Sequence, residues 1–371
     1  MEYIATLYVQ LLSKLMKRFP LTSLVLSLIA LLSCMVHPSI AQEKSGGKIH
    51  GYAFGDYYFM VGADTLPKRG AAQYSSTPKN DHGFLLRRVY LGYDYTFNES
   101  FSSQVLLEGN DKTLDGSGRY GFIIKTAFVE WKEIIPMGNL LLGLIPTPTW
   151  NLTTEKVWNY RAVEKTITDF RGLGNGSDIG VALRGKFDTD GAVSYALMFA
   201  NGNGQKPEND KHKKYHAALT AKPIDHFVLE GYIDHETAND DRSKTMLKGF
   251  AAYQSTAFTV GVEVFQMTQK KFGANNTDLT PFGVSVFAWA PIPSIDDVNA
   301  FARFDMYDPD SKTTTSGIKE NFLTLGVDYM PIKNVHVMPN LWMNTYAQKD
   351  GNRTAPKSDV AGRITFWFVY K

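Results

Sequence analysis

The sequence predicts an all-β protein, a transmembrane antiparallel β-barrel of sixteen strands with short periplasmic turns and long external loops. Three observations predict this fold: apolar side chains recur every second residue, short and long connections alternate, and the chain ends in aromatic residues. The 371 residues include one cysteine, which excludes a disulfide scaffold and a multi-thiol metal site. A formal net charge of +2 argues against a protein built mainly to grip nucleic acid.

Residues 1–41 are predicted to be a cleaved secretory signal peptide. Basic residues precede an uncharged apolar run over 21–36, and small residues lead to a cleavage site after Ala41. Residues 42–371 then form the barrel domain. Three alternatives stay open: translation from Met16, a single membrane anchor in place of the cleaved signal, and lipidation of Cys34.

The two-residue periodicity gives each predicted strand two different faces. In the last segment Val360, Ile364 and Phe368 share one face, whereas Asp359 and Arg363 share the other. Charges recur on this second face of nearly every strand. A water-filled lumen accommodates such charges, whereas the dry core of a soluble sandwich does not.

The connections indicate how many strands there are. Seven tight turns rich in Pro, Gly and Asn alternate strictly with eight longer polar stretches, so fifteen connections join sixteen strands. Outer-membrane barrels separate short and long connections to opposite ends in this way, and a soluble sandwich has no reason to do so. The long stretches are residues 63–82, 110–118, 146–176, 202–212, 236–243, 268–279, 308–318 and 347–356.

Aromatic residues mark the C-terminus and the expected strand ends. The final segment 366–370 is aromatic at four of its five positions, which is typical of the last strand of an outer-membrane barrel. Interfacial girdles are expected from further aromatics near strand ends, with ordinary packing as the alternative. These residues are Tyr93, Tyr95, Trp131, Trp289, Tyr329 and Tyr346.

The third long connection, residues 146–176, is the candidate constriction loop. It is the longest, and its four basic and three acidic residues leave a net charge of +1. Charged side chains at a constriction select ions by sign. A lid on the surface is the alternative placement of this loop.

Several short motifs resemble the phosphate-selective porin O and P family. The resemblance implies a sixteen-stranded, trimeric outer-membrane pore, and it is clearest over residues 83–187. It is carried by Gly83-Phe84-Leu85-Leu86-Arg87-Arg88-Val89-Tyr90-Leu91-Gly92, by Ala127-Phe128-Val129-Glu130-Trp131, by Gly143 to Pro146, and by Tyr160-Arg161 through Asp169 to Gly180.

The lumen departs from the basic lumen that this resemblance implies. Strict alternation places five basic and ten acidic side chains inward and leaves Lys125, Lys214 and Lys248 ambiguous, so phosphate specificity is not carried over. The candidate residues for contact with a passing solute are basic, and salt bridges along the wall are the alternative role for each. They are Arg87, Arg88, Arg161, Lys165 and Arg171.

No motif indicates catalysis, a metal site or a cofactor, and no enzymatic activity is expected. His212 and His216 lie four residues apart in a Lys-rich segment, where a solvated cluster is the simpler interpretation. The segment 308–311 begins like a calcium loop but lacks the glycine and the terminal glutamate.

The predicted function is passive diffusion of small hydrophilic solutes or ions through a porin of the bacterial outer membrane. The expected partners are outer-membrane lipid, these solutes and two further copies in a homotrimer, with no nucleic acid. The alternative is a closed structural or adhesive barrel that acts through its external loops. A lipase or protease barrel would need a Ser, His and acid set that no spacing indicates.

Overall fold

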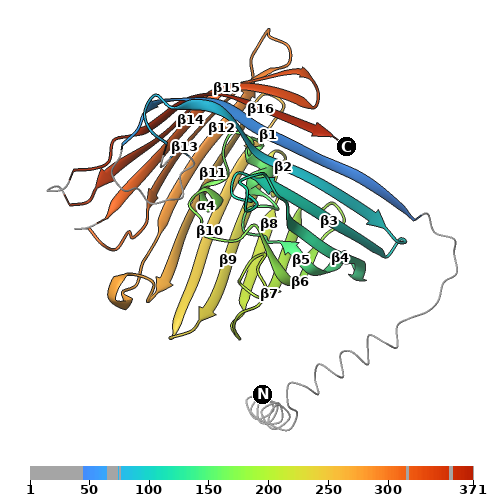
Figure 1. Ribbon diagram of the computed structural model, residues 1–371. Coiled ribbons are helices and arrows are strands. Elements are labelled where there is room, and N and C mark those ends of the chain that lie inside the picture. The colour runs from blue at the N-terminus through green and yellow to red at the C-terminus, as the bar shows by residue number, and fades with distance from the viewer. Residues whose placement is uncertain (1–44, 65–73, 75–76, 315–316, 351–353, 371) are drawn as a thin grey trace. The chain divides into compact units, whose positions relative to one another are not determined.

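The computed structural model describes residues 45–64, 74, 77–314, 317–350 and 354–370, and the predicted signal peptide lies outside these ranges. The described strands form a closed antiparallel barrel in which β1 (Gly46–Gly62) pairs with β16 (Asp359–Tyr370) (Figure 1). The predicted fold class and the sixteen strands are therefore confirmed. The remaining elements are β2 (His82–Thr96), β3 (Phe101–Asn110), β4 (Ile123–Ile135), β5 (Gly138–Pro146), α3 (Thr154–Trp158), α4 (Ile167–Phe170), β6 (Ser177–Lys186), β7 (Val193–Ala200), β8 (Lys214–Ala221), β9 (Phe227–Ala238), β10 (Arg242–Gln254), β11 (Thr259–Lys270), η1 (Ala274–Asn276), β12 (Phe282–Pro291), β13 (Val298–Asp308), β14 (Ile318–Ile332) and β15 (Val335–Gln348).

Each strand forms hydrogen bonds with the strands before and after it in the sequence, and β1 and β16 bond to each other. This simple order accounts for the whole wall of the barrel. None of the helices in the described ranges is long and apolar enough to cross a membrane.

One predicted long connection is short in the structure. Between β9 and β10 only residues 239–241 leave the ladder, because both strands continue through the polar residues on either side. Asp240 and Asp241 turn the chain with φ angles of 62° and 56°, a left-handed conformation that Asp tolerates better than most residues. Polar composition alone therefore overstated the length of this loop.

The predicted faces hold along most strands, and two girdle residues are corrected. Tyr93 and Tyr329 are about half exposed on the outer face, as a girdle requires. Trp289 instead donates from Nε1 to the Val157 carbonyl oxygen at 3.1 Å, and the buried Tyr346 donates to Asp359 at 2.5 Å. Both rings therefore point into the barrel, because the alternation along β12 and β15 places these two positions on the inner face.

The closing seam between β1 and β16 uses glycine against aromatic rings. A Cβ atom on Gly51 would lie 2.5 Å from the Tyr370 ring, and one on Gly55 would lie 2.5 Å from the Phe366 ring. The Tyr370 hydroxyl also donates across β1 to the Tyr90 carbonyl oxygen at 2.7 Å. The aromatic C-terminal residues thus cover the glycines of the first strand where the barrel closes.

The calcium-like segment after β13 holds a lysine where a calcium loop holds its ion. The Lys349 ammonium lies 2.6 Å from Asp308 Oδ1, 2.5 Å from the Asp310 carbonyl oxygen and 2.6 Å from the Thr313 carbonyl oxygen. Its side chain is only 2% exposed. An internal cation therefore satisfies these oxygens.

Candidate functional site: the third loop and the inner wall

The loop between β5 and β6 lies inside the barrel, with α3 and α4 among the strands (Figure 1). Trp158 and Tyr160 of this loop are fully buried against Phe287 and Phe301 of the wall, with the Tyr160 and Phe301 rings stacked at 4.5 Å. Burying rings of this size is strongly favourable. The loop is therefore packed against the inner wall and is not a surface lid.

Arginines of the wall bind the main chain of the loop. Arg363 donates to the Val163 carbonyl oxygen at 3.1 Å, and Arg87 donates to the same oxygen at 3.3 Å. Arg303 donates to the carbonyl oxygen of Lys165. Three guanidinium groups from different strands thus hold one short stretch of loop backbone, a use suited to their fixed fork of donors.

Each of these arginines is backed by a buried carboxylate. Arg303 forms a bidentate pair with Asp305 at 2.8 and 2.6 Å, and Arg87 forms an ion pair with Asp56 at 2.5 Å and donates to it through Nη2 at 3.2 Å. Near α4, Arg171 contacts Glu320 at 2.5 Å. Buried charges are tolerated because they are paired in this way.

Two β-bulges turn extra basic side chains into the barrel. Arg88 pairs with Phe54 and Leu86 with Gly55, so Arg87 is an extra residue on β2. Lys125 is an extra residue on β4 in the same sense. A bulge re-aims a side chain, and here it lets the consecutive Arg87 and Arg88 both reach interior carboxylates.

Basic groups of the wall surround one carboxylate opposite the loop. Glu108 on β3 accepts a hydrogen bond from Arg88 at 2.5 Å and forms an ion pair with the Lys125 ammonium at 2.9 Å. The Glu108 side chain is 4% exposed, whereas those of Arg88 and Lys125 are 15% and 21% exposed. The positive groups therefore lie nearer to the lumen than the acid that pairs with them.

The loop presents a second charged group toward this wall. Arg161 binds Glu155, and it also donates to Asp169 at 2.8 Å. Lys165 has no hydrogen bond from its ammonium to the described residues, and its closest carboxylate oxygen is on Asp169 at 3.8 Å. At 29% exposure, Lys165 has the most accessible side chain of this group.

The pKa values of the loop residues show how closely these charges lie. Burial lowers the pKa of Lys165, Asp169 opposes this, and the guanidinium groups of Arg88 and Arg161 lower it further. Burial opposes ionisation of Asp169, but Lys165 and Arg161 outweigh it and lower the Asp169 pKa to about 2. For Glu155, burial raises the pKa despite the attraction of Arg161.

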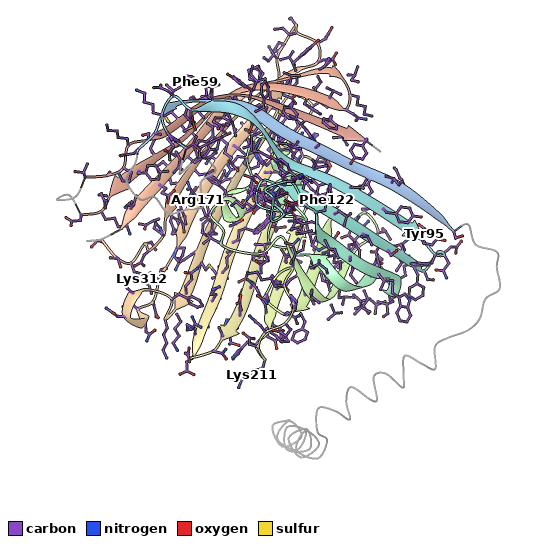
Figure 2. The ribbon with its side chains drawn as sticks, viewed as in Figure 1. Phe59, Tyr95, Phe122, Arg171, Lys211 and Lys312 are labelled. Atoms are coloured by element: carbon purple, nitrogen blue, oxygen red, sulfur yellow. The ribbon has the colours of Figure 1, made fainter. Side chains whose placement is uncertain are left out.

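The five residues proposed from the sequence fall into two groups. Arg88, Arg161 and Lys165 lie together where the loop faces the wall, and all three remain partly exposed. Arg87 and Arg171 are 5% and 6% exposed and bind the loop to the wall (Figure 2 labels Arg171). The structure therefore brings three of the five together and places the other two at buried contacts between the loop and the wall.

Sequence reasoning missed several interior groups. Lys125, Lys214 and Lys248 were ambiguous by alternation, and all three point inward to Glu108, Asp234 and Glu230 respectively. Charge complementarity between adjacent strands was a usable signal, since Lys214 lies two residues from the register partner of Asp234. No sequence signal fixed the bulge at Lys125. The count of five basic against ten acidic side chains is therefore wrong as a measure of the lumen.

The described residues thus form a closed sixteen-stranded antiparallel barrel with its third loop inside. No family model matches the sequence, and neither does any curated protein. Solved structures match the fold at low sequence identity, as expected for a likeness of architecture alone.

Three similar structures illustrate this likeness. OmpT of Vibrio cholerae is 12% identical over 90% of this chain and 100% of its own, with a TM-score of 0.61. An anion-selective porin from Comamonas acidovorans is 12% identical over 88% of this chain and 100% of its own, with a TM-score of 0.60. The outer-membrane channel DcaP of Acinetobacter baumannii is 9% identical over 90% of this chain and 100% of its own, with a TM-score of 0.63.

Proposed function

We propose that this protein is a passive pore of the bacterial outer membrane that lets small hydrophilic solutes diffuse, with a modest preference for anions. The observation that carries the proposal is a difference in solvent exposure between inward side chains on the two sides of the lumen. Beneath the loop, inward side chains such as Asp305 and Thr324 are fully buried, whereas Arg88 and Lys125 opposite the loop keep contact with solvent. A water-filled passage between the loop and strands β2–β6 accounts for this difference.

The sign of the preference follows from the groups on both sides of this passage. Arg88, Lys125, Arg161 and Lys165 face the acids Glu108, Glu155 and Asp169, which leaves one excess positive charge. Glu108 is the most buried of the seven. Charge at a constriction sets the barrier for each ion, so anions cross more easily.

The proposed location of the protein is the bacterial outer membrane, and its proposed assembly is a homotrimer. The chain is exported through the cleaved signal peptide 1–41, and its apolar outer face contacts outer-membrane lipid. It assembles as a homotrimer. A V. cholerae OmpT structure described as a trimer form, 12% identical with a TM-score of 0.57, supports this assembly. The proposal assigns no enzymatic reaction and no cofactor to the chain.

Single-channel recording of the purified protein in a planar bilayer under a KCl gradient tests the function. Discrete conductance steps with a reversal potential on the chloride side are expected. A folded barrel without steps would contradict the pore and favour the closed barrel that acts through its loops. Steps with a potassium-side reversal would contradict only the anion preference.

A further inference from the structure

The wall near the first helix of the loop contains two adjoining cavities, whose lining residues are not among the seven charged groups that set the proposed ion preference. One, of about 270 Å³, lies between α3 and strands β7–β10, and the other, of about 540 Å³, lies against β5–β7. Both are lined by Leu152 and Ser194, so they adjoin. We call the two together the short-turn bay, because residues of the tight turns, such as Thr189 and Lys222, form part of their lining.

The bay is basic. Lys156 and Lys222 line the first cavity, and Arg184 and Lys186 line the second. Within the part of the chain that the structure describes, Lys156, Lys186 and Lys222 form no ion pair. The acid in the lining is Glu133, which is exposed at the edge of the second cavity.

Arg184 adds an unsatisfied donor to this charge. It donates through Nη2 to the Pro146 carbonyl oxygen at 2.5 Å, while its buried Nε has no hydrogen-bond partner. A buried donor without an acceptor is costly, and the same side chain lines the second cavity with its positive charge.

The floor of the bay is apolar. Leu152 and Val157 of the loop face Ala196, Ala218 and Val228 of the wall in the first cavity. An inorganic ion gains nothing from this floor, whereas an organic anion gains roughly 25 cal/mol for each Å² of apolar surface that it buries. Volumes of this size lie in or close to the range of small-molecule sites, which is about 300–1,000 Å³.

We propose that the short-turn bay binds small organic anions, namely carboxylates with an apolar body, on the short-turn side of the constriction. The carboxylate lies against Lys156, Lys222 or Arg184 and the body lies on the apolar floor. This inference rests on the proposed pore, because solutes reach the bay through the lumen. The charges of the passage favour organic and inorganic anions alike, whereas the apolar floor of the bay favours the organic ones.

The test uses benzoate as the organic anion and inorganic phosphate as the comparison. Each is added to one side and then the other of a single channel in a planar bilayer. Benzoate is expected to interrupt the current in a concentration-dependent manner from one side, and phosphate to do so far more weakly. Substituting both Lys156→Gln and Lys222→Gln should weaken the block by about tenfold or more, since a charge-assisted contact is lost.

A matched control removes the same charge elsewhere. Lys211→Gln with Lys312→Gln changes two exposed lysines of the long loops, which Figure 2 labels, and should leave the block unchanged. Absence of block by benzoate, equal block in both double variants, or equal block by phosphate with the same lysine dependence would each overturn the inference.

Equilibrium dialysis of labelled benzoate against the folded protein in detergent separates the two proposals. A channel that conducts but binds no benzoate refutes the bay alone. A protein that binds benzoate through Lys156 and Lys222 but shows no conductance refutes the pore and retains the bay.

Discussion

The inner wall of the barrel has two unlike regions, and arginine serves a different purpose in each. On β13, Arg303 is 2% exposed and joins Asp305 to the loop backbone. On β2, Arg88 is 15% exposed and pairs with Glu108 beside the loop without binding its backbone. These two arginines show that an inward basic side chain of this barrel can anchor the loop or can face solvent beside it. Exposure beside the loop separates the two roles, and residue type does not.

The largest expected effect breaks the anchoring region. Arg303→Met would leave Asp305 buried without its partner and remove a donor from the loop backbone. Losing one member of a buried ion pair costs about 3–5 kcal/mol. Urea unfolding in detergent, followed by tryptophan fluorescence, should show this loss, and Arg119→Met on an exposed loop should not. Equal stability of the two variants would contradict the anchoring role.

The second prediction concerns the region that faces solvent. Lys165→Glu reverses the charge of a side chain whose ammonium makes no hydrogen bond within the described residues, so the fold should be retained. A change of about 1 kcal/mol in the barrier would lower the chloride-to-potassium permeability ratio by about fivefold. Reversal potentials under a KCl gradient measure it, with Lys312→Glu as the control. An unchanged ratio would place Lys165 outside the passage.

A third prediction sharpens the comparison through the pH dependence of stability. Lys165 and Arg161 lower the Asp169 pKa to about 2, so its stabilising contribution is complete above its ordinary value and is lost as the pH falls toward 2. Asp169→Asn should therefore cost about 2 kcal/mol at pH 6 and almost nothing near pH 2. Urea unfolding across this range tests it, with Asp225→Asn in an exposed short turn as the control. A pH-independent cost would show that the ion pair is not the cause.

The smallest expected effect is a pH dependence of selectivity. Burial raises the Glu155 pKa, so this side chain takes up a proton before ordinary carboxyl groups when the pH falls. The passage then gains positive charge, and the anion preference should increase as the pH falls toward the range in which ordinary carboxyl groups titrate. Glu155→Gln should flatten this slope in reversal-potential measurements. A slope that survives the substitution would assign the titration to another group.

The number of strands could be predicted from the sequence because short and long connections alternate along it. Most of the inner and outer faces could be predicted because side chains alternate in every strand. The bulges at Arg87 and Lys125 could not, since an extra residue changes the face of its neighbours without leaving a mark in the local pattern. Trp289 and Tyr346 were misplaced because an aromatic ring near a strand end was taken as an outer-face position, whereas the alternation places both rings inside.

The candidate site was predictable only in part for a related reason. The length and charge of the third loop indicated where solute contacts would lie. Whether a given arginine anchors that loop or faces solvent depends on contacts between residues far apart in the chain, such as Arg363 with Val163. No spacing along the sequence encodes such a contact.

The lysine that occupies the loop after β13 takes the place of a dissolved metal ion in holding the surrounding oxygens. A loop shaped by a dissolved metal changes when that metal becomes scarce, whereas the Lys349 ammonium is tethered and always present. We therefore expect residues 308–313 to keep the same conformation in calcium-rich and in chelator-treated solution. The conformation of this segment is therefore independent of the concentration of free calcium.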